Sequence, residues 1–133
     1  NARLRRLPMQ THGKQAGWMI IAAIIAVAVV GCNRGQSAKA TAEQLAKSFE
    51  KANASIKQEV VQAGDALQAS NYVQAIIIMD RVVQTQQIDE AQKKAVDAVI
   101  IQTRQAVRQN PRLDSAELYK ATSDLLIRVH GEN

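Results

Sequence analysis

Aromatic side chains are scarce in this sequence, which has one tryptophan, two tyrosines and one phenylalanine among 133 residues. Proteins that bind single-stranded nucleic acids stack the bases on aromatic rings, so the composition argues against that class of function. Only two prolines and six glycines are present, and both residue types interrupt helices. These absences favour an all-α chain and disfavour nucleic acid as a partner.

Histidine and cysteine are also nearly absent. The two histidines, His12 and His130, stand at opposite ends, and neither lies at metal-ligand spacing from another His, Cys, Asp or Glu. Serine and cysteine catalysis need an internal histidine base, which the sequence lacks. No glycine-rich phosphate loop occurs either. We therefore predict no metal, no cofactor and no catalytic site.

Acidic residues are missing from the N-terminal part alone. Residues 1–31 carry four basic residues and no acidic one, whereas residues 32–133 carry 13 basic and 12 acidic residues. The net charge of +5 therefore belongs to the N-terminal segment. It does not indicate a nucleic-acid partner for the remainder of the chain.

The N-terminal segment has the layout of an export signal. A basic and polar stretch, 1–15, precedes an uncharged apolar run, 16–31, and small polar residues follow. The basic flank predicts that the N-terminus stays in the cytoplasm and that the C-terminal part is exported. We expect translation to start at Met9. The apolar run is somewhat shorter than the roughly 20 residues of a spanning helix, yet an uncleaved signal anchor remains an alternative.

The junction Val29-Val30-Gly31-Cys32 resembles the lipobox of bacterial lipoproteins, and Cys32 is the only cysteine in the chain. The resemblance implies that the Cys32 thiol is acylated and that the signal is cleaved between Gly31 and Cys32. Acyl chains would then anchor the chain to a membrane without a spanning helix. On this interpretation 1–31 is a signal peptide, 32–40 is the lipidated cysteine with a flexible tether, and 41–130 is a helical domain.

Apolar residues at helical spacing predict four helices after the tether, over 41–69, 72–86, 89–109 and 114–130. Gly64 lies inside the first of these and predicts the close approach of a neighbouring helix; a break near 52–55 is an alternative. The predicted capping pairs are Thr41 with Gln44, Asp89 with Gln92, and Asp114 with Glu117. Asp80, within an apolar helix, either pairs with a neighbouring helix or faces water.

The stretch 66–76, with Met79 and Val82 after it, resembles the hairpin of tetratricopeptide repeats. In that family an aromatic residue, here Tyr72, opens the second helix, and a small residue, here Ala75, is the contact point between helices. Short connections predict that successive helices are antiparallel neighbours. We therefore expect a compact four-helix domain made of two hairpins, 41–86 and 88–130.

The two densest apolar segments, 76–79 and 99–101, belong to a core by default. The alternative is that Ile77, Ile78 or Ile101 lines a surface groove that receives a partner helix or a second copy. The sequence thus favours a non-enzymatic interaction or scaffold protein of the bacterial envelope, anchored by its lipid. A self-associating structural lipoprotein is the alternative. Asn33 after the cysteine favours the periplasmic face of the outer membrane over the inner membrane or the cell surface.

Overall fold

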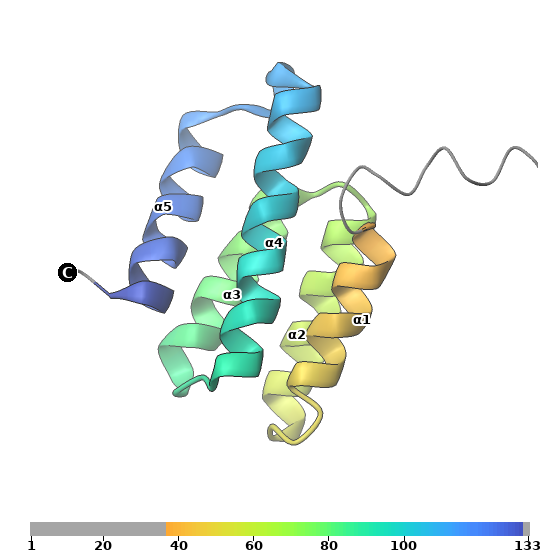
Figure 1. Ribbon diagram of the computed structural model, residues 1–133, viewed down its shortest axis with the longest axis vertical. Helices are drawn as coiled ribbons and strands as arrows, with labels where there is room; N and C mark the ends of the chain where they lie inside the picture. Colours follow the sequence, from red (N-terminus) through yellow and green to blue (C-terminus); the bar gives the residue numbers. More distant parts are fainter. Residues whose placement is uncertain (1–36, 132–133) are drawn as a thin grey trace, which may run out of the picture. The chain divides into compact units, whose positions relative to one another are not determined.

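The computed structural model describes residues 37–131, and these form five α-helices and one short 3-10 helix without any strand (Figure 1). The predicted all-α class is confirmed. The chain runs up and down, so that α1, α3 and α5 point one way and α2 and α4 the other (Figure 1). The elements are α1 (Ala38–Ser48), α2 (Ala54–Gln68), α3 (Tyr72–Thr85), α4 (Glu90–Gln109), η2 (Pro111–Leu113) and α5 (Ala116–His130).

The first predicted helix is two helices, so the expected count of four was wrong. Phe49 ends α1, and the side chain of Asn53 then starts α2 by accepting a hydrogen bond from the Ile56 amide at 2.9 Å. Phe49 and Ile56 are both buried and lie seven residues apart, which keeps the apolar stripe in phase across the turn. Periodicity alone therefore could not show that this stretch forms two helices. The break near 52–55, given above as the alternative, lies close to the observed turn between α1 and α2.

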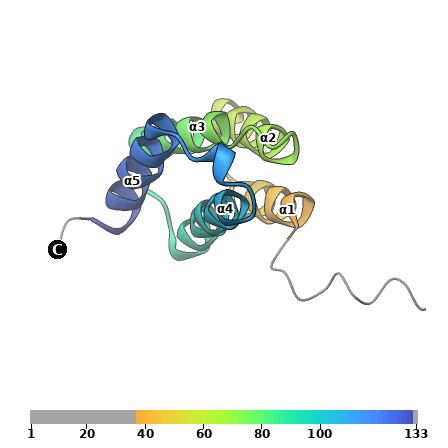
Figure 2. The ribbon, with the colours of Figure 1, turned by 90° about the horizontal axis from the view of Figure 1, so that it is seen from above.

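The helices form two layers, with α2, α3 and α5 in one and α1 and α4 in the other (Figure 2). The most extensive contacts are those of α2 with α3, α1 with α2, and α3 with α5. Helix α4 packs mainly against α1, and it contacts α3 and α5 only sparsely. The first predicted hairpin is therefore present as α2 and α3, whereas the second is not, because α4 and α5 separate to pack against different helices.

The core consists of the stripes that each helix turns inward. The only phenylalanine, Phe49, is fully buried, and Ala75 is fully buried at the position that the repeat resemblance assigned to it. The apolar core residues are Leu45, Phe49, Ile56, Val60, Ala63, Leu67, Ala75, Ile76, Ile78, Met79, Val82, Ala95, Val96, Val99, Ile100, Leu118, Leu125 and Val129.

Side-chain caps fix where the helices begin. The predicted pair of Asp89 and Gln92 is confirmed as a reciprocal capping box, with bonds of 2.8 and 2.9 Å. Ser37 caps α1 in place of Thr41, which is buried inside that helix, so residues 37–40 are not part of a flexible tether. Ser115 caps α5 in place of Asp114. The predictions for residues 1–36, including Gly31 and Cys32, lie outside the described residues.

Gly64 lies where α2 crosses α1, as the sequence suggested. A Cβ atom added to Gly64 would lie 3.1 Å from the Cβ of Ala42, which is tighter than ordinary contact. The absence of a side chain therefore allows the two backbones to approach.

We expect Gly64→Val to lower the free energy of unfolding by about 2 kcal/mol, because overpacking forces α1 and α2 apart. Urea denaturation of the full chain, followed by circular dichroism, measures this. Gln62→Val introduces the same side chain at an exposed position of α2 and serves as the matched control. Equal losses in the two variants would show that Gly64 has no packing role.

Ser70 ends α2 in the left-handed conformation, with φ of 60°. The Asn71 amide donates to the Ala66 carbonyl at 2.8 Å and the Ser70 amide to the Leu67 carbonyl at 3.1 Å, which is the Schellman pattern. Glycine is the usual residue at this position because it has no Cβ to strain.

Ser70→Gly should therefore raise the free energy of unfolding by about 1 kcal/mol. Ser55→Gly, in the exposed first turn of α2, should lower the free energy of unfolding. Glycine is a poorer helix former than serine, and no left-handed strain is relieved at this position. Parallel urea titrations of the two variants make the comparison, and a destabilised Ser70→Gly variant would contradict it.

Candidate functional site: the groove between α4 and α5

The separation of α4 from α5 leaves a groove with a volume of about 380 Å³. Helix α4 and helix α5 supply its two walls, and the segment that follows η2 supplies one end. The lining residues are Thr103, Arg104, Val107, Arg108, Asp114, Leu118, Tyr119, Thr122 and Ser123. We call this feature the α4–α5 groove.

The floor of the groove consists of buried side chains that present mainly apolar atoms. Thr103 and Thr122 are buried, and each hydroxyl donates to a carbonyl of its own helix, Thr103 to Val99 at 2.9 Å and Thr122 to Leu118 at 2.7 Å. These internal bonds satisfy the hydroxyls and leave the threonine methyl groups available for contact. Leu118 is 3% exposed and packs beside them. A ligand would therefore find hydrocarbon at the bottom of the groove.

Two arginines, Arg104 and Arg108, stand on the α4 wall, and both residues are exposed. Within residues 37–131, neither takes part in any of the ion pairs of the structure. Asp114 also lines the groove, beyond ion-pair distance of both arginines. The α4 wall therefore carries two arginines that form no ion pair, and Asp114 is the only acidic residue among those that line the groove.

Lys120 of α5, by contrast, forms an ion pair within its own helix. Lys120 donates to Asp124 at 2.6 Å, and this hydrogen bond, together with the charge of Asp124, raises the pKa of the Lys120 ammonium group. Lys120 stays charged at neutral pH, but its charge is matched locally. The unmatched positive charge at the groove therefore comes from α4.

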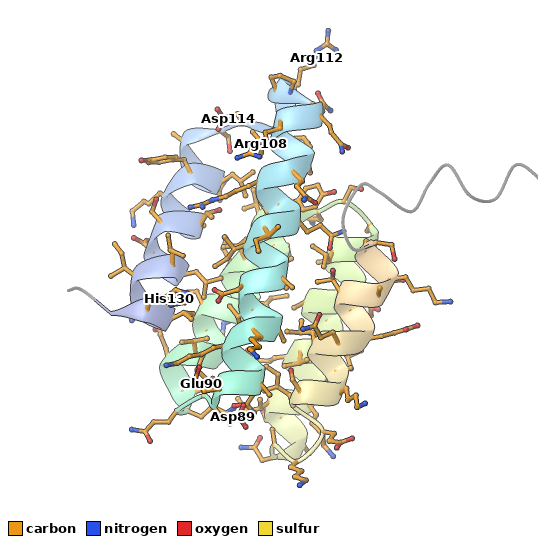
Figure 3. All side chains as sticks on the ribbon, in the orientation of Figure 1. Asp89, Glu90, Arg108, Arg112, Asp114 and His130 are labelled. Atoms are coloured by element: carbon orange, nitrogen blue, oxygen red, sulfur yellow. The ribbon has the colours of Figure 1, made fainter. Side chains whose placement is uncertain are left out.

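A side-chain hydrogen bond joins α4 and α5 beyond the groove, on the side away from η2. His130 Nε2 of α5 lies 2.8 Å from Asp97 Oδ1 of α4. Figure 3 shows His130 at the C-terminal end of α5, and Arg108 with Asp114 toward the opposite end of that helix. Arg128 donates to Asp80 at 2.7 Å, so of the two alternatives left open for Asp80 the structure shows the pairing with a neighbouring helix.

Exposed apolar side chains border the groove. Tyr119 is 73% exposed, Ile101 is 55% exposed and Ile127 is 47% exposed, and these are three of the four large apolar residues exposed within residues 37–131. Ile101 lies three residues before Arg104, and Ile127 lies four residues after Ser123, so helical spacing places both beside residues that line the groove. Apolar groups at the rim would extend the contact area of a ligand.

The three predicted groove residues have different positions. Ile101 is exposed beside the groove, whereas Ile78 is 3% exposed and belongs to the core, because α3 is covered by other helices on more than one side. Ile77 is half-buried on α3 and is not among the residues that line the groove. Sequence reasoning missed Arg104, Arg108 and Tyr119. The four-residue spacing of the arginines was visible, but only the fold shows that a groove lies beside them.

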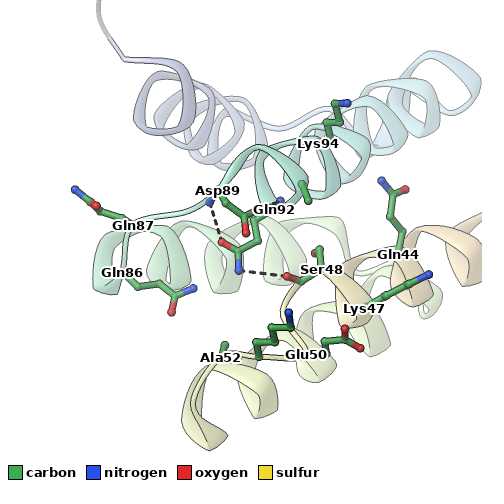
Figure 4. Close-up of a pocket in the computed structure, with 12 residues that line it drawn as sticks. Gln44, Lys47, Ser48, Glu50, Ala52, Gln86, Gln87, Asp89, Gln92 and Lys94 are labelled. Atoms are coloured by element: carbon green, nitrogen blue, oxygen red, sulfur yellow. Dashed lines mark hydrogen bonds between the residues drawn. The ribbon is translucent and has the colours of Figure 1, made fainter.

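A second, polar depression of about 580 Å³ lies where the end of α1 and the turn after it meet the segment before α4 and the start of α4 (Figure 4). Gln92 is at its centre and has two structural roles. It completes the capping box with Asp89, and its Nε2 donates to the Ser48 carbonyl at 3.2 Å, which joins α4 to α1. We interpret this depression as a junction between helices, because its central side chain is occupied in holding the fold.

The described residues contain no group of three or more His, Cys, Asp or Glu side chains that could hold a metal ion. Among the same residues, none of the helices combines the length and the hydropathy that crossing a membrane requires. No protein-family model matches the chain, and no curated protein or solved structure matches it either.

If Tyr119 serves a ligand and Leu118 serves the core, replacing them should have different costs. We expect Leu118→Ala to lower the free energy of unfolding by about 2–5 kcal/mol, because it empties a buried site. Tyr119→Ala should change it by less than about 0.5 kcal/mol. Urea denaturation of both variants provides the measurement, and a large loss in Tyr119→Ala would assign that side chain to structure.

Proposed function

We propose that this chain is an exported bacterial lipoprotein, anchored through Cys32, whose helical domain is a non-catalytic protein-interaction module of the cell envelope. The observation that carries the interaction role is the α4–α5 groove, with its apolar floor, its two arginines that form no ion pair, and its exposed apolar rim. Surfaces of this kind bind other macromolecules. Binding removes the apolar patch from water, and the charged neighbours fix the orientation of the partner.

The sequence supports the anchor through the basic and apolar leader and the position of Cys32. The start of α1 adds a length constraint. Ser37 caps α1, so five residue steps join it to Cys32, and a chain of that length spans at most about 18 Å. A lipid on Cys32 would therefore hold the start of α1 near the membrane surface.

The η2 end of the groove lies at the same end of the helical domain as the start of α1 (Figure 1). The bond from Gln92 to Ser48 aligns the first turn of α4 with the last turn of the antiparallel α1. From Gln92 to its last residue α4 extends about 26 Å, and from Ser48 back to its first residue α1 extends about 15 Å in the same direction. Helix α4 therefore reaches roughly 10 Å beyond the first residue of α1. This overhang is shorter than the maximum span of the tether. An anchored domain can thus present the η2 end of the groove to components at the membrane surface.

The anchor is tested by expressing the full chain in a Gram-negative host with an alkyne-labelled fatty acid and measuring the intact mass. We expect a labelled protein that starts at Cys32, and we expect Cys32→Ser to be unlabelled and to keep its leader. Gln36→Ser, a nearby polar change, is the matched control and should be labelled and cleaved normally. An unlabelled chain that retains its leader would overturn the anchor and leave a signal-anchor protein.

A further inference from the structure

We propose that the α4–α5 groove binds an amphipathic helix of a different protein, and that this helix carries two acidic residues one turn apart beside its apolar stripe. The inference rests on the proposed interaction function and names the chemistry of the partner. It is argued from the spacing of the arginines, the shape of the groove and the charges of the other available occupants.

The arginines define the acidic pair. Arg104 and Arg108 are four residues apart on α4, so their backbone positions differ by about 6 Å along the helix axis. Both are exposed and lack an acidic partner among the described residues. The guanidinium group binds carboxylates through paired hydrogen bonds. Two carboxylates three or four residues apart on a helix lie on one face at the matching separation.

The groove favours a helix as the occupant. Its walls are two helices, and no strand edge exists among residues 37–131 onto which an extended peptide could add. The buried floor around Leu118 and the exposed ring of Tyr119 offer contact to an apolar stripe with residues at positions i, i+3, i+4 and i+7. Asp114 lies at the η2 end with Arg108 and would weaken the attraction of that arginine for a carboxylate, so the stronger of the two ion pairs is expected at Arg104.

The N-terminal segment of this chain, residues 1–36, is excluded as the occupant of the groove by its charge. Residues 1–36 contain five basic residues and no acidic one, so they would be repelled by Arg104 and Arg108. A second copy of the chain also lacks the required pattern. None of the α-helices of the described part carries two acidic residues three or four positions apart. The occupant is therefore a different protein.

The test uses a defined probe, a fluorescein-labelled 16-residue helical peptide with a leucine stripe and two glutamates four residues apart. A matched peptide has glutamines in place of the glutamates. Binding to the full chain in neutral detergent is followed by fluorescence anisotropy. We expect the glutamate peptide to bind more tightly than the glutamine peptide, and added salt to reduce the difference.

Variants of the protein locate the site. Arg104→Gln/Arg108→Gln should weaken binding of the glutamate peptide about tenfold, because two exposed charge pairs are lost. Lys47→Gln/Lys51→Gln removes two cations with the same spacing at the polar depression and should leave the affinity unchanged. Tyr119→Ala should weaken both peptides by a similar factor, since it removes apolar contact. Equal losses in the two double variants would reduce the effect to net charge and overturn the proposal.

Two further measurements test other occupants. If the chain, without binding the peptide, binds vesicles containing phosphatidylglycerol through Arg104 and Arg108, the arginines recognise lipid head groups and the proposal fails. If sedimentation shows a dimer that the Arg104→Gln/Arg108→Gln variant loses, the groove is a self-association surface and the proposal fails as well.

Peptide binding does not require acylation, so a negative lipid-labelling result at Cys32 would leave this inference standing and remove only the anchor.

Discussion

The packing of α4 against α1 is the constraint on which the rest of this structure depends. Gln92 bonds across to Ser48, and this contact draws the start of α4 toward α1, away from its sequence neighbour α5. Helix α5 packs instead on α3, where Arg128 also bonds to Asp80. The two helices that a short connection would pair therefore diverge, and they meet at the Asp97–His130 pair. The α4–α5 groove is the space that this divergence leaves.

The sequence predicted most of the local structure, because apolar periodicity and capping chemistry are local properties. The inward stripes of α3, α4 and α5, the capping box at Asp89 and the close approach at Gly64 follow directly from residue spacing. The turn after Phe49 was assigned to one long helix because seven residues across it preserve the phase of the stripe. The pairing of α4 with α1 could not be predicted, since it depends on a contact between residues 44 positions apart.

The candidate site was predictable in part. For Ile101 the sequence favoured the core and offered a surface groove as the alternative, and the residue is exposed beside the groove. Ile78, chosen by the same reasoning, is buried because α3 contacts helices on more than one side. Arg104 and Arg108 form an ordinary solvated helix face in the sequence. Their importance comes from a tertiary arrangement that places an apolar floor beside them and no acidic partner.

The central physical claim is that α4 packs on α1 and leaves its other side open toward α5. Nuclear Overhauser effects measured on the isotopically labelled full chain in detergent test it most directly. We expect contacts from the Gln92 side-chain amide to the last turn of α1, and contacts between α4 and α5 concentrated at the Asp97–His130 end. Contacts along the whole length of α4 and α5, with none between α4 and α1, would contradict the account.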